Sequence, residues 1–451
     1  MPEVNGAALT LAWITPFAGL LLSIAVLPLV APAFWQRHYG KTSLFWSLTF
    51  LIPFALLFGA SVAFHAVMHT VQAEYVPFMI LLLALFTVTG GIHVKGNPRG
   101  TPALNTGILA LGTVLASVIG TTGAAMLLIR PLLRANDARR HNAHVVIFFI
   151  FLVANIGGAL TPLGDPPLFL GFLKGVDFFW TTRAMLWPTL AAALLLLVVF
   201  FVIDSWFFRQ AGEARPASMD PTPDSRVGID GMLNLLILAP MILVSVIVSG
   251  LWNPGVGYSG HGMHIELQDA ARDLTLIAIA WLSWRYTPAG LREAHHFEWA
   301  PIIEVAKLFA GIFLTIIPVI AILRAGYEGA MAPLLAMVTD EAGRPRDALY
   351  FWMAGGLSSF LDNAPTYLVF FNLAGGDPVA LMGPLASTLT AISAGAVFMG
   401  ANTYIGNAPN FMVKSIAQSR GVAMPGFFSY MVWSGCILLP TFALLTIVFF
   451  R

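Results

Sequence analysis

The segment Thr161-Pro-Leu-Gly-Asp-Pro-Pro-Leu-Phe-Leu170 decides the fold, because it recurs later in the chain as Thr403-Tyr-Ile-Gly-Asn-Ala-Pro-Asn-Phe-Met412. The two segments align without gaps at a spacing of 242 residues and keep Thr, Gly, Pro and Phe at matching positions. Each interrupts an apolar stretch with residues that break a helix. A repeated interruption of this kind indicates that the chain contains two related halves.

A second pair of matches precedes the first in both halves. A spacing one residue shorter places Ser117 on Ser358, Thr121 on Asp362, Thr122 on Asn363 and Leu127 on Leu368. Chance could produce either match alone, but hardly both in the same order. We therefore predict an internal duplication, as in transporters that are built from inverted repeats.

The composition indicates a membrane protein. The 451 residues are 58% hydrophobic and 10% charged, whereas soluble chains carry about 25% charged residues. The net charge of +1 gives no reason to expect a nucleic-acid partner, and the single cysteine, Cys436, allows no internal disulfide. Residues 1–8 lack the features of a cleaved signal peptide, so the first apolar run is predicted to be a retained helix.

Apolar runs long enough to cross a bilayer recur along the chain. We predict spanning helices at residues 9–30, 42–65, 75–94, 142–174, 181–208, 231–250, 268–287, 300–325, 380–419 and 424–450. Two further stretches, 102–134 and 346–373, are interrupted at Gly120-Thr-Thr-Gly123 and Leu361-Asp-Asn-Ala-Pro365. Their arms are short, so both are predicted to be re-entrant hairpins. The expected fold is an all-α polytopic membrane protein.

Each half is predicted to hold three helices, a re-entrant hairpin, an interrupted helix and a final helix. The first repeat covers residues 1–208, with a scaffold at 9–94 and transport elements at 102–208. The second covers 231–451, with a scaffold at 231–325 and transport elements at 346–450. Each half crosses the membrane five times, and because this number is odd, the second repeat is inverted relative to the first. Lys and Arg are twice as frequent on one side, which makes the linker 209–230 cytoplasmic and directs both termini outward.

The interruptions are the expected binding site, because irregular backbone at membrane depth is tolerated only where it lines a cavity or is buried in protein. They carry carboxylate, amide and hydroxyl groups, the oxygen ligands that hard cations such as Na+ prefer. The candidate residues are Thr121, Thr122, Asn155, Thr161, Asp165, Asp362, Asn363, Thr366, Asn402, Thr403 and Asn407. No Lys or Arg lies in the four interruptions.

Asp165 and Asp362 are the candidate Na+ ligands. Asp165 precedes Pro166 and Pro167, so it is also expected to cap the helix that follows. The matching residue, Asn407, would cap equally well without a charge. A carboxylate in the membrane is costly unless it is paired with a cation. Because a proton and Na+ would compete for such a carboxylate, the pattern favours antiport.

Several other polar residues have less specific interpretations. Glu304 and Lys307 permit an ion pair that would serve as a proton relay or would lie at the interface. We predict that Asp204 is interfacial. His261, His264, Glu266, His295 and His296 lie in predicted loops, where histidines without a further ligand rarely bind metal. Gly255-Val-Gly-Tyr-Ser-Gly260 matches a dinucleotide fingerprint only by letter, because no strand is predicted before it.

The segments 117–136 and 155–167 resemble the ion transporter superfamily, and most closely the NhaD-type sodium/proton antiporters. Citrate, dicarboxylate and arsenite carriers are other members. The resemblance implies a homodimer in which scaffold domains hold mobile transport domains that move as an elevator. Dicarboxylate carriers have Ser-Asn-Thr at both hairpin tips. Here the tips read Gly-Thr-Thr-Gly and Leu-Asp-Asn-Ala, which argues against a dicarboxylate site.

The leading functional hypothesis is Na+/H+ antiport at a site near the bilayer midplane, in a multi-pass protein of the bacterial inner membrane. The alternative is Na+- or H+-coupled transport of citrate or a dicarboxylate. Na+ is expected as the transported or coupling ion, and no other cofactor is expected. A membrane-embedded enzyme is not favoured, because the sequence has no nucleophile, metal or phosphate-binding pattern.

Overall fold

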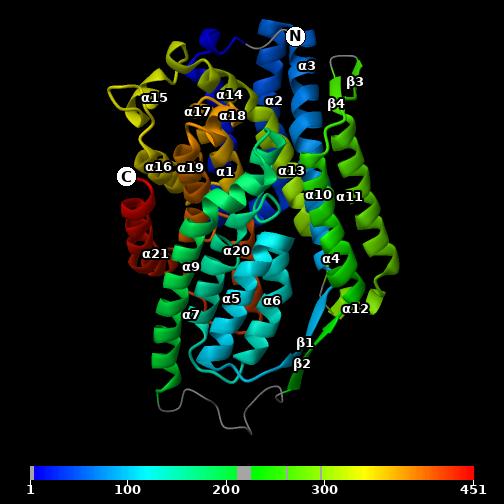
Figure 1. Cartoon of the computed structure of the whole chain (residues 1–451), viewed down its shortest axis with the longest axis vertical. Coiled ribbons are helices and arrows are strands. Elements are labelled where there is room, and N and C mark those ends of the chain that lie inside the picture. The colour runs from blue at the N-terminus through cyan, green and yellow to red at the C-terminus, as the bar shows by residue number, and fades with distance from the viewer. Residues whose placement is uncertain (1–4, 211–224, 261–262, 295–296) are drawn as a thin grey trace.

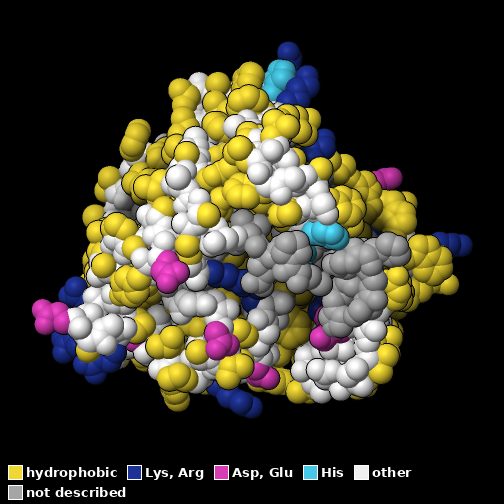
Figure 2. All heavy atoms as spheres, turned by 90° about the horizontal axis from the view of Figure 1, so that it is seen from above, with side chains coloured by type: hydrophobic (Ala, Val, Ile, Leu, Met, Phe, Trp, Pro, Cys, Tyr) yellow, Lys and Arg dark blue, Asp and Glu magenta, His cyan; other side chains and the backbone are white. Residues whose placement is uncertain are grey.

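Helices dominate the computed structural model, which describes residues 5–210, 225–260, 263–294 and 297–451 (Figure 1). Within these residues, nine helices are long and apolar enough to cross a membrane. The protein is therefore a multi-pass integral membrane protein. Seen end-on, hydrophobic side chains make up much of its outline (Figure 2), as expected for a surface that faces lipid.

The helices of the first half are α1 (Thr15–Val30), α2 (Pro32–Phe58), α3 (Ala60–Thr70), α4 (Val76–Thr89), α5 (Pro102–Ile119), α6 (Thr121–Ala135), α7 (Ala143–Leu152), α8 (Pro166–Leu173) and α9 (Phe178–Phe208). A π-helical segment, Val71–Tyr75, joins α3 to α4, and a 3-10 turn, Ile156–Leu160, follows α7. Short 3-10 turns also precede α1 at Gly6–Ala8 and Leu11–Ile14.

The helices of the second half are α10 (Ala239–Leu251), α11 (Leu267–Tyr286), α12 (Ala289–Ala294), α13 (Ala300–Thr315), α14 (Ile317–Arg324), α15 (Ala332–Val338), α16 (Asp347–Ser358), α17 (Asn363–Leu373), α18 (Pro378–Met382), α19 (Ala386–Phe398), α20 (Ala408–Ser419) and α21 (Phe427–Phe449). A π-helical segment, Asn234–Leu238, precedes α10, and 3-10 turns occupy Gly326–Glu328 and Met399–Asn402.

Two expected spans are displaced. The span predicted at 42–65 is α2, which ends where Gly59 adopts a φ of 93°. The span predicted at 75–94 is part of a longer helical run, Ala60–Thr89. The residues between the two predicted spans are helical as well, because the π-helical segment keeps their backbone hydrogen-bonded within the helix. The predicted span 268–287 is the helix α11, which is not among the nine because its first turns are charged.

The fold is mostly helical, as expected, and short strands that were not expected pair at two places. β1 (His93–Asn97) pairs antiparallel with β2 (Ser225–Asp230), and β3 (Gly257–Gly260) pairs with β4 (Met263–Glu266). The predicted linker 209–230 therefore ends in a strand, whereas residues 211–224 lie outside the described residues.

The centre of the molecule is α7. The segment 143–160 is 89% buried, whereas the apolar windows of α2 and α9 are 22% and 28% buried. A run of Val, Ile and Phe that is apolar on all sides must be surrounded by protein. The interruption that follows α7 is therefore placed deep inside the helical body.

The two repeated motifs adopt the same backbone conformation. Asp165 (φ −145°, ψ 143°) and Asn407 (φ −152°, ψ 140°) are the N-caps of α8 and α20. The hydroxyl of Thr161 donates to the Ser117 carbonyl, and the hydroxyl of Thr403 donates to the Ser359 carbonyl, each at 2.5 Å. One spacing of 242 residues therefore relates both motifs to their hydrogen-bond partners.

This spacing corrects the alignment of the helical tips by one residue. α6 begins at Thr121 and α17 begins at Asn363, so these two residues correspond. The expectation that Thr121 matches Asp362 is wrong, and the counterpart of Asp362 is Gly120. The sequence match failed because Ser358 and Ser359 are adjacent, and a match of letters alone selected the first of them.

Glycine pairs allow the chain to cross itself at both interruptions. A Cβ atom on Gly164 would lie 2.1 Å from the Gly158 carbonyl oxygen, and one on Gly406 would lie 2.6 Å from the Gly400 carbonyl oxygen. Both distances are well below van der Waals contact. Only glycine therefore permits these two crossings.

We predict that Gly164→Ala and Gly406→Ala each greatly reduce the amount of folded protein, because the methyl group would collide with backbone. The matched control is Gly435→Ala, since a Cβ atom there has no neighbour within 4 Å and alanine favours α21 by about 0.5–1 kcal/mol. Detergent size-exclusion chromatography of fluorescently tagged variants measures the monodisperse fraction. Equal yields of all three variants would contradict the role given to the glycine pairs.

Candidate functional site

The Asp165 carboxylate is the centre of a buried polar cluster that involves both repeated motifs. Its side chain is 1% exposed. The Thr121 hydroxyl donates to Oδ1 over 3.0 Å, the Asn407 amide donates to Oδ1 over 3.3 Å, and the Asn363 amide donates to Oδ2. The carboxylate thus receives three hydrogen bonds, from donors that belong to three different helices.

Four helix N-termini meet at this carboxylate. Asp165 is the N-cap of α8, and Asn407 is the N-cap of α20. Thr121 and Asn363 are the first residues of α6 and α17. Each N-terminus presents the positive end of a helix dipole and stabilises a nearby anion by about 0.3–2 kcal/mol. Together they reduce the cost of an ionised acidic side chain inside a membrane, which is about 2.5–3.5 kcal/mol at the bilayer centre.

The expectation that an ionised Asp165 needs a counter-cation stays a prediction. Among the described residues, no Lys or Arg side chain contacts its carboxylate. The polar groups that face it are the three neutral donors and the convergent helix N-termini. A site of this kind holds one negative charge and becomes attractive to a second anion when the first is neutralised.

A chain of asparagines connects the two motifs. The Asn407 amide also donates to the Asn155 side-chain oxygen over 3.3 Å, and the Asn155 amide donates to the Asn410 side-chain oxygen over 2.7 Å. The Asn410 amide then donates to the carbonyls of Gly400 and Thr403. All three asparagines are buried. These hydrogen bonds between asparagines orient the Asn407 side chain so that its amide nitrogen points at Asp165.

The sequence reasoning missed Asn410. Its counterpart in the first motif is Leu168, so the alignment treated the position as part of an apolar helix. An asparagine on the inner face of a short helix was the signal that would have identified it, because an amide needs partners when it is buried. The Gly158–Gly164 and Gly400–Gly406 pairs were also not identified as necessary for the site.

One acceptor in the cluster remains open. The Asn363 side-chain oxygen is buried and has no hydrogen-bond partner among the described residues, and the same is true of the Asn402 side-chain oxygen. Buried acceptors without donors are rare, and a bound ion or water is a common reason for them. Asn363 therefore presents its amide to Asp165, while its buried oxygen has no hydrogen-bond partner among the described residues.

Several predicted site residues lie outside the Asp165 cluster. Thr161 and Thr403 hold the interruptions against the preceding helical tips, and Asn402 donates to the Ser359 hydroxyl over 2.9 Å. Thr366 donates to the Asp362 carbonyl over 3.0 Å. Thr122 lies half-buried in the first turn of α6. These residues shape the backbone around the cluster rather than contact the carboxylate.

Asp362 is half-buried and caps α17. Its carboxylate accepts the backbone N–H of Ala364 over 3.0 Å, and the next residue along the chain contacts Asp165. Asp362 therefore caps α17 with a side-chain hydrogen bond. Asp165 occupies the N-cap position of α8, as the sequence suggested, but its side chain makes no hydrogen bond to that helix. The two carboxylates have different surroundings.

The predicted relay pair does not form. Glu304 is half-buried and hydrogen-bonds Trp35, whereas the Lys307 ammonium lies 5.4 Å from the centroid of the Tyr39 ring. Both contacts are with α2, because the two side chains leave α13 toward that helix. Of the loop residues considered for metal, His261, His295 and His296 lie outside the described residues, and no metal-binding group of three ligands occurs in the described part.

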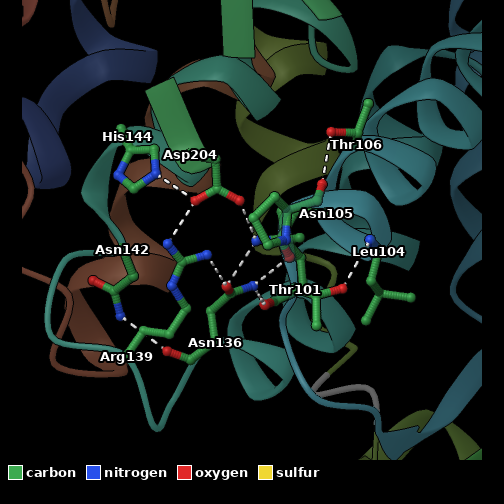
Figure 3. A network of polar contacts seen from close by, with 11 residues as sticks. Thr101, Leu104, Asn105, Thr106, Asn136, Arg139, Asn142, His144 and Asp204 are labelled. Atoms are coloured by element: carbon green, nitrogen blue, oxygen red, sulfur yellow. Dashed lines mark hydrogen bonds and ion pairs between the residues drawn. The ribbon is translucent and has the colours of Figure 1, made fainter. Parts of the chain in front are cut away.

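A second buried charged cluster surrounds Asp204, near the end of α9 (Figure 3). The Arg139 guanidinium lies 2.6 Å from Oδ1, the His144 ring lies 2.8 Å from the same oxygen, and the Asn105 amide donates to Oδ2 over 3.0 Å. Asn105 and Asn136 also exchange hydrogen bonds. The cluster connects the start of α5 and the end of α6 to α7 and α9.

The interfacial position predicted for Asp204 is wrong, because the residue is completely buried. Proximity to Trp206 and Arg209 in the sequence suggested an interface, but Asp204 faces inward while Trp206 is 61% exposed. On a helix, residues two apart point in different directions. The charge is compensated by Arg139 rather than by solvent.

Comparison with known proteins supports a transport role. The sequence profile of one protein family, described as "Putative citrate transport", matches residues 6–450. Two relatives, each named an uncharacterized transporter, come from Mycobacterium bovis and Mycobacterium tuberculosis. Each is 25% identical to this chain over 356 residues, which cover 76% of this chain and 77% of the relative.

We predict that Arg139→Met lowers the free energy of unfolding by about 3–5 kcal/mol, because it leaves the Asp204 charge buried without its cationic partner. Thermal unfolding in detergent measures the change as a lower midpoint. The matched control is Arg344→Met, which removes an exposed pair with Asp340 and is expected to leave the midpoint unchanged. Equal midpoints for both variants would show that Arg139 does not compensate Asp204.

Proposed function

Because the chain belongs to the citrate transport family, whose profile spans residues 6–450, we propose that it is a secondary transporter that moves a citrate-like carboxylate with a coupling cation, H+ or Na+. The family is one of transporters and not of enzymes. The observation that carries the proposal is the meeting of four helix N-termini at the buried Asp165 carboxylate.

The coupling follows from electrostatics. When Asp165 is ionised, its own charge occupies the positive field of the N-termini and repels a second anion. When a proton or Na+ neutralises Asp165, that field is free to stabilise a carboxylate group of the substrate. Cation binding and substrate binding therefore favour each other, which is the requirement for symport.

The neutral groups around Asp165 have distinct roles in this proposal. Thr121, Asn363 and Asn407 hold the carboxylate, and the open oxygen of Asn363 is available to a cation. Asn155 and Asn410 orient Asn407. Asp362 serves as the cap of α17, a role that asparagine would also fill. We therefore assign the coupling charge to Asp165 alone.

The second candidate function is Na+/H+ exchange. It is favoured by the absence of any Lys or Arg contact to Asp165 among the described residues, since a carboxylate with neutral oxygen neighbours suits a hard cation. In that case Asp165 and Asp362 would both exchange Na+ for H+. The two functions differ in whether a carboxylate crosses the membrane.

The proposed architecture is that of two inverted repeats with α5–α6 and α16–α17 as re-entrant hairpins. The shared spacing of 242 residues at the tips and interruptions supports it. We further propose an elevator-type motion in a homodimer of the bacterial inner membrane. Its orientation would place both termini outward, and β1–β2 with the linker on the cytoplasmic side.

We predict that Asp165→Asn abolishes cation-driven accumulation of citrate but retains citrate exchange. A permanently neutral side chain leaves the positive N-termini available for the substrate, while the binding of the driving cation is lost. Purified protein in proteoliposomes is given an inward H+ or Na+ gradient, and radiolabelled citrate uptake and counterflow are measured. The matched control is Asp177→Asn, an exposed N-cap of α9, which is expected to accumulate citrate normally.

Two results would overturn the assignment. Gradient-driven citrate accumulation by Asp165→Asn would show that coupling occurs elsewhere. Absence of citrate uptake by the unmodified protein, together with Na+-induced proton release that is lost in both Asp165→Asn and Asp362→Asn, would favour Na+/H+ exchange. Normal coupled uptake in Asp362→Asn is the result that agrees with its role as a cap.

A further inference from the structure

A buried ion pair lies at the far end of the helix that Asp165 caps. The Lys174 ammonium contacts the Glu74 carboxylate, and the two side chains are 15% and 6% exposed. Lys174 is the C-cap residue of α8. Glu74 lies in the π-helical segment Val71–Tyr75 that joins α3 to α4. The pair thus connects α8 to a helix from the first part of the chain.

The short length of α8 relates this pair to Asp165. The helix has eight residues, which corresponds to about 12 Å at a rise of 1.5 Å per residue. A helix of two turns behaves as one rigid unit, so a shift at Lys174 is transmitted to its N-cap. Close approach of Gly171 to the Tyr367 hydroxyl packs the same helix on α17, which carries Asn363.

The π-helical segment that carries Glu74 is attached to α13 through the neighbouring residue, Tyr75. The neighbouring Tyr75 hydroxyl donates to the Ala306 carbonyl over 3.0 Å, and its ring packs on Phe313 at a centroid distance of 6.1 Å. π-Helical insertions are costly and occur frequently at functional sites. Here the insertion directs Glu74 toward the end of α8. One Glu74 oxygen contacts Lys174, and the other has no partner among the described residues.

Stability alone gives little reason for this pair. A buried ion pair often contributes no more than well-packed apolar residues would, because both charges lose their hydration. Lys174 does complement the negative end of the α8 dipole, but a half-exposed lysine would achieve this without Glu74. The need to position Asp165 at the other end of α8 accounts for the pair better than stability does.

We propose that Glu74 and Lys174 are positioning residues that hold α8 in register, so that the Asp165 carboxylate stays within reach of Thr121, Asn363 and Asn407. The proposal rests on the function assigned to Asp165. Neither residue contacts that carboxylate. Loss of the pair would let α8 shift along α17, and a misplacement of about 1 Å at a site can lower its activity by up to about a hundredfold.

The test compares Glu74→Gln, Lys174→Met and the double variant in proteoliposomes and in detergent. Each single variant leaves one buried charge unpaired and is expected to lower the thermal midpoint, whereas the double variant leaves none and should recover it. The KM for citrate should rise about tenfold in all three. Recovery of both properties in the double variant would overturn the proposal, because a structural pair restores both together.

A readout that needs no substrate separates this proposal from the proposed function. Carbodiimide labelling of Asp165, followed by peptide mass spectrometry, reports how accessible and how well bound the carboxyl group is. Labelling should be faster in the three variants than in the unmodified protein. The matched control is Lys95→Met, which removes an exposed ion pair with Asp230 at 2.5 Å and should not change labelling. Unchanged labelling in the three variants would refute the positioning role, whatever substrate is transported.

Discussion

One constraint governs this structure, the burial of the Asp165 carboxylate at the meeting point of four helix N-termini. A charge in that position cannot be left without compensation, and the chain provides dipoles and amide donors instead of a cationic side chain. In the proposed function this makes the charge exchangeable. An arginine partner would bind the carboxylate permanently, whereas neutral donors would allow a proton or Na+ to take over the compensation.

Much of the surrounding architecture serves to bring those N-termini together. The glycine pairs let the chain cross itself beside Asp165 and beside Asn407, and the Thr161 and Thr403 hydroxyls tie each interruption to the helical tip before it. The asparagine chain joins the two interruptions to each other. The Asp204 cluster fixes the opposite ends of α5, α6, α7 and α9 (Figure 3). Polar contacts of this kind have few competing partners inside a membrane protein.

The sequence predicted the interruptions, the recurrence of the segment 161–170 as 403–412 and all three residues that donate hydrogen bonds to Asp165. These features depend on Gly, Pro, Asn and Asp in apolar stretches, where helix-breaking and polar residues are costly unless they are buried in protein or line a cavity. It did not predict the one-residue correction that matches Thr121 with Asn363, because adjacent serines made two alignments equivalent. It also misplaced Asp204, since direction around a helix is decided by neighbours distant in sequence.

Contacts between distant segments were the other limit. Glu74 and Lys174 are 100 residues apart, and neither has a local partner that would have drawn attention to it. Asn410 was hidden because its counterpart is Leu168. Conversely, Glu304 and Lys307 had the spacing of a helical ion pair but found partners on α2 instead. The spacing of residues along one helix determines which side-chain pairs can form. Packing against other helices decides which of those pairs do form.

The most direct test of the central claim is the linkage between cation and citrate binding in detergent-purified protein, measured by isothermal titration calorimetry at several pH values and Na+ concentrations. We expect citrate affinity to rise as H+ or Na+ increases, and in Asp165→Asn we expect an affinity that no longer depends on either cation. The same cation dependence in Asp165→Asn as in the unmodified protein would contradict the assignment of the coupling charge to Asp165.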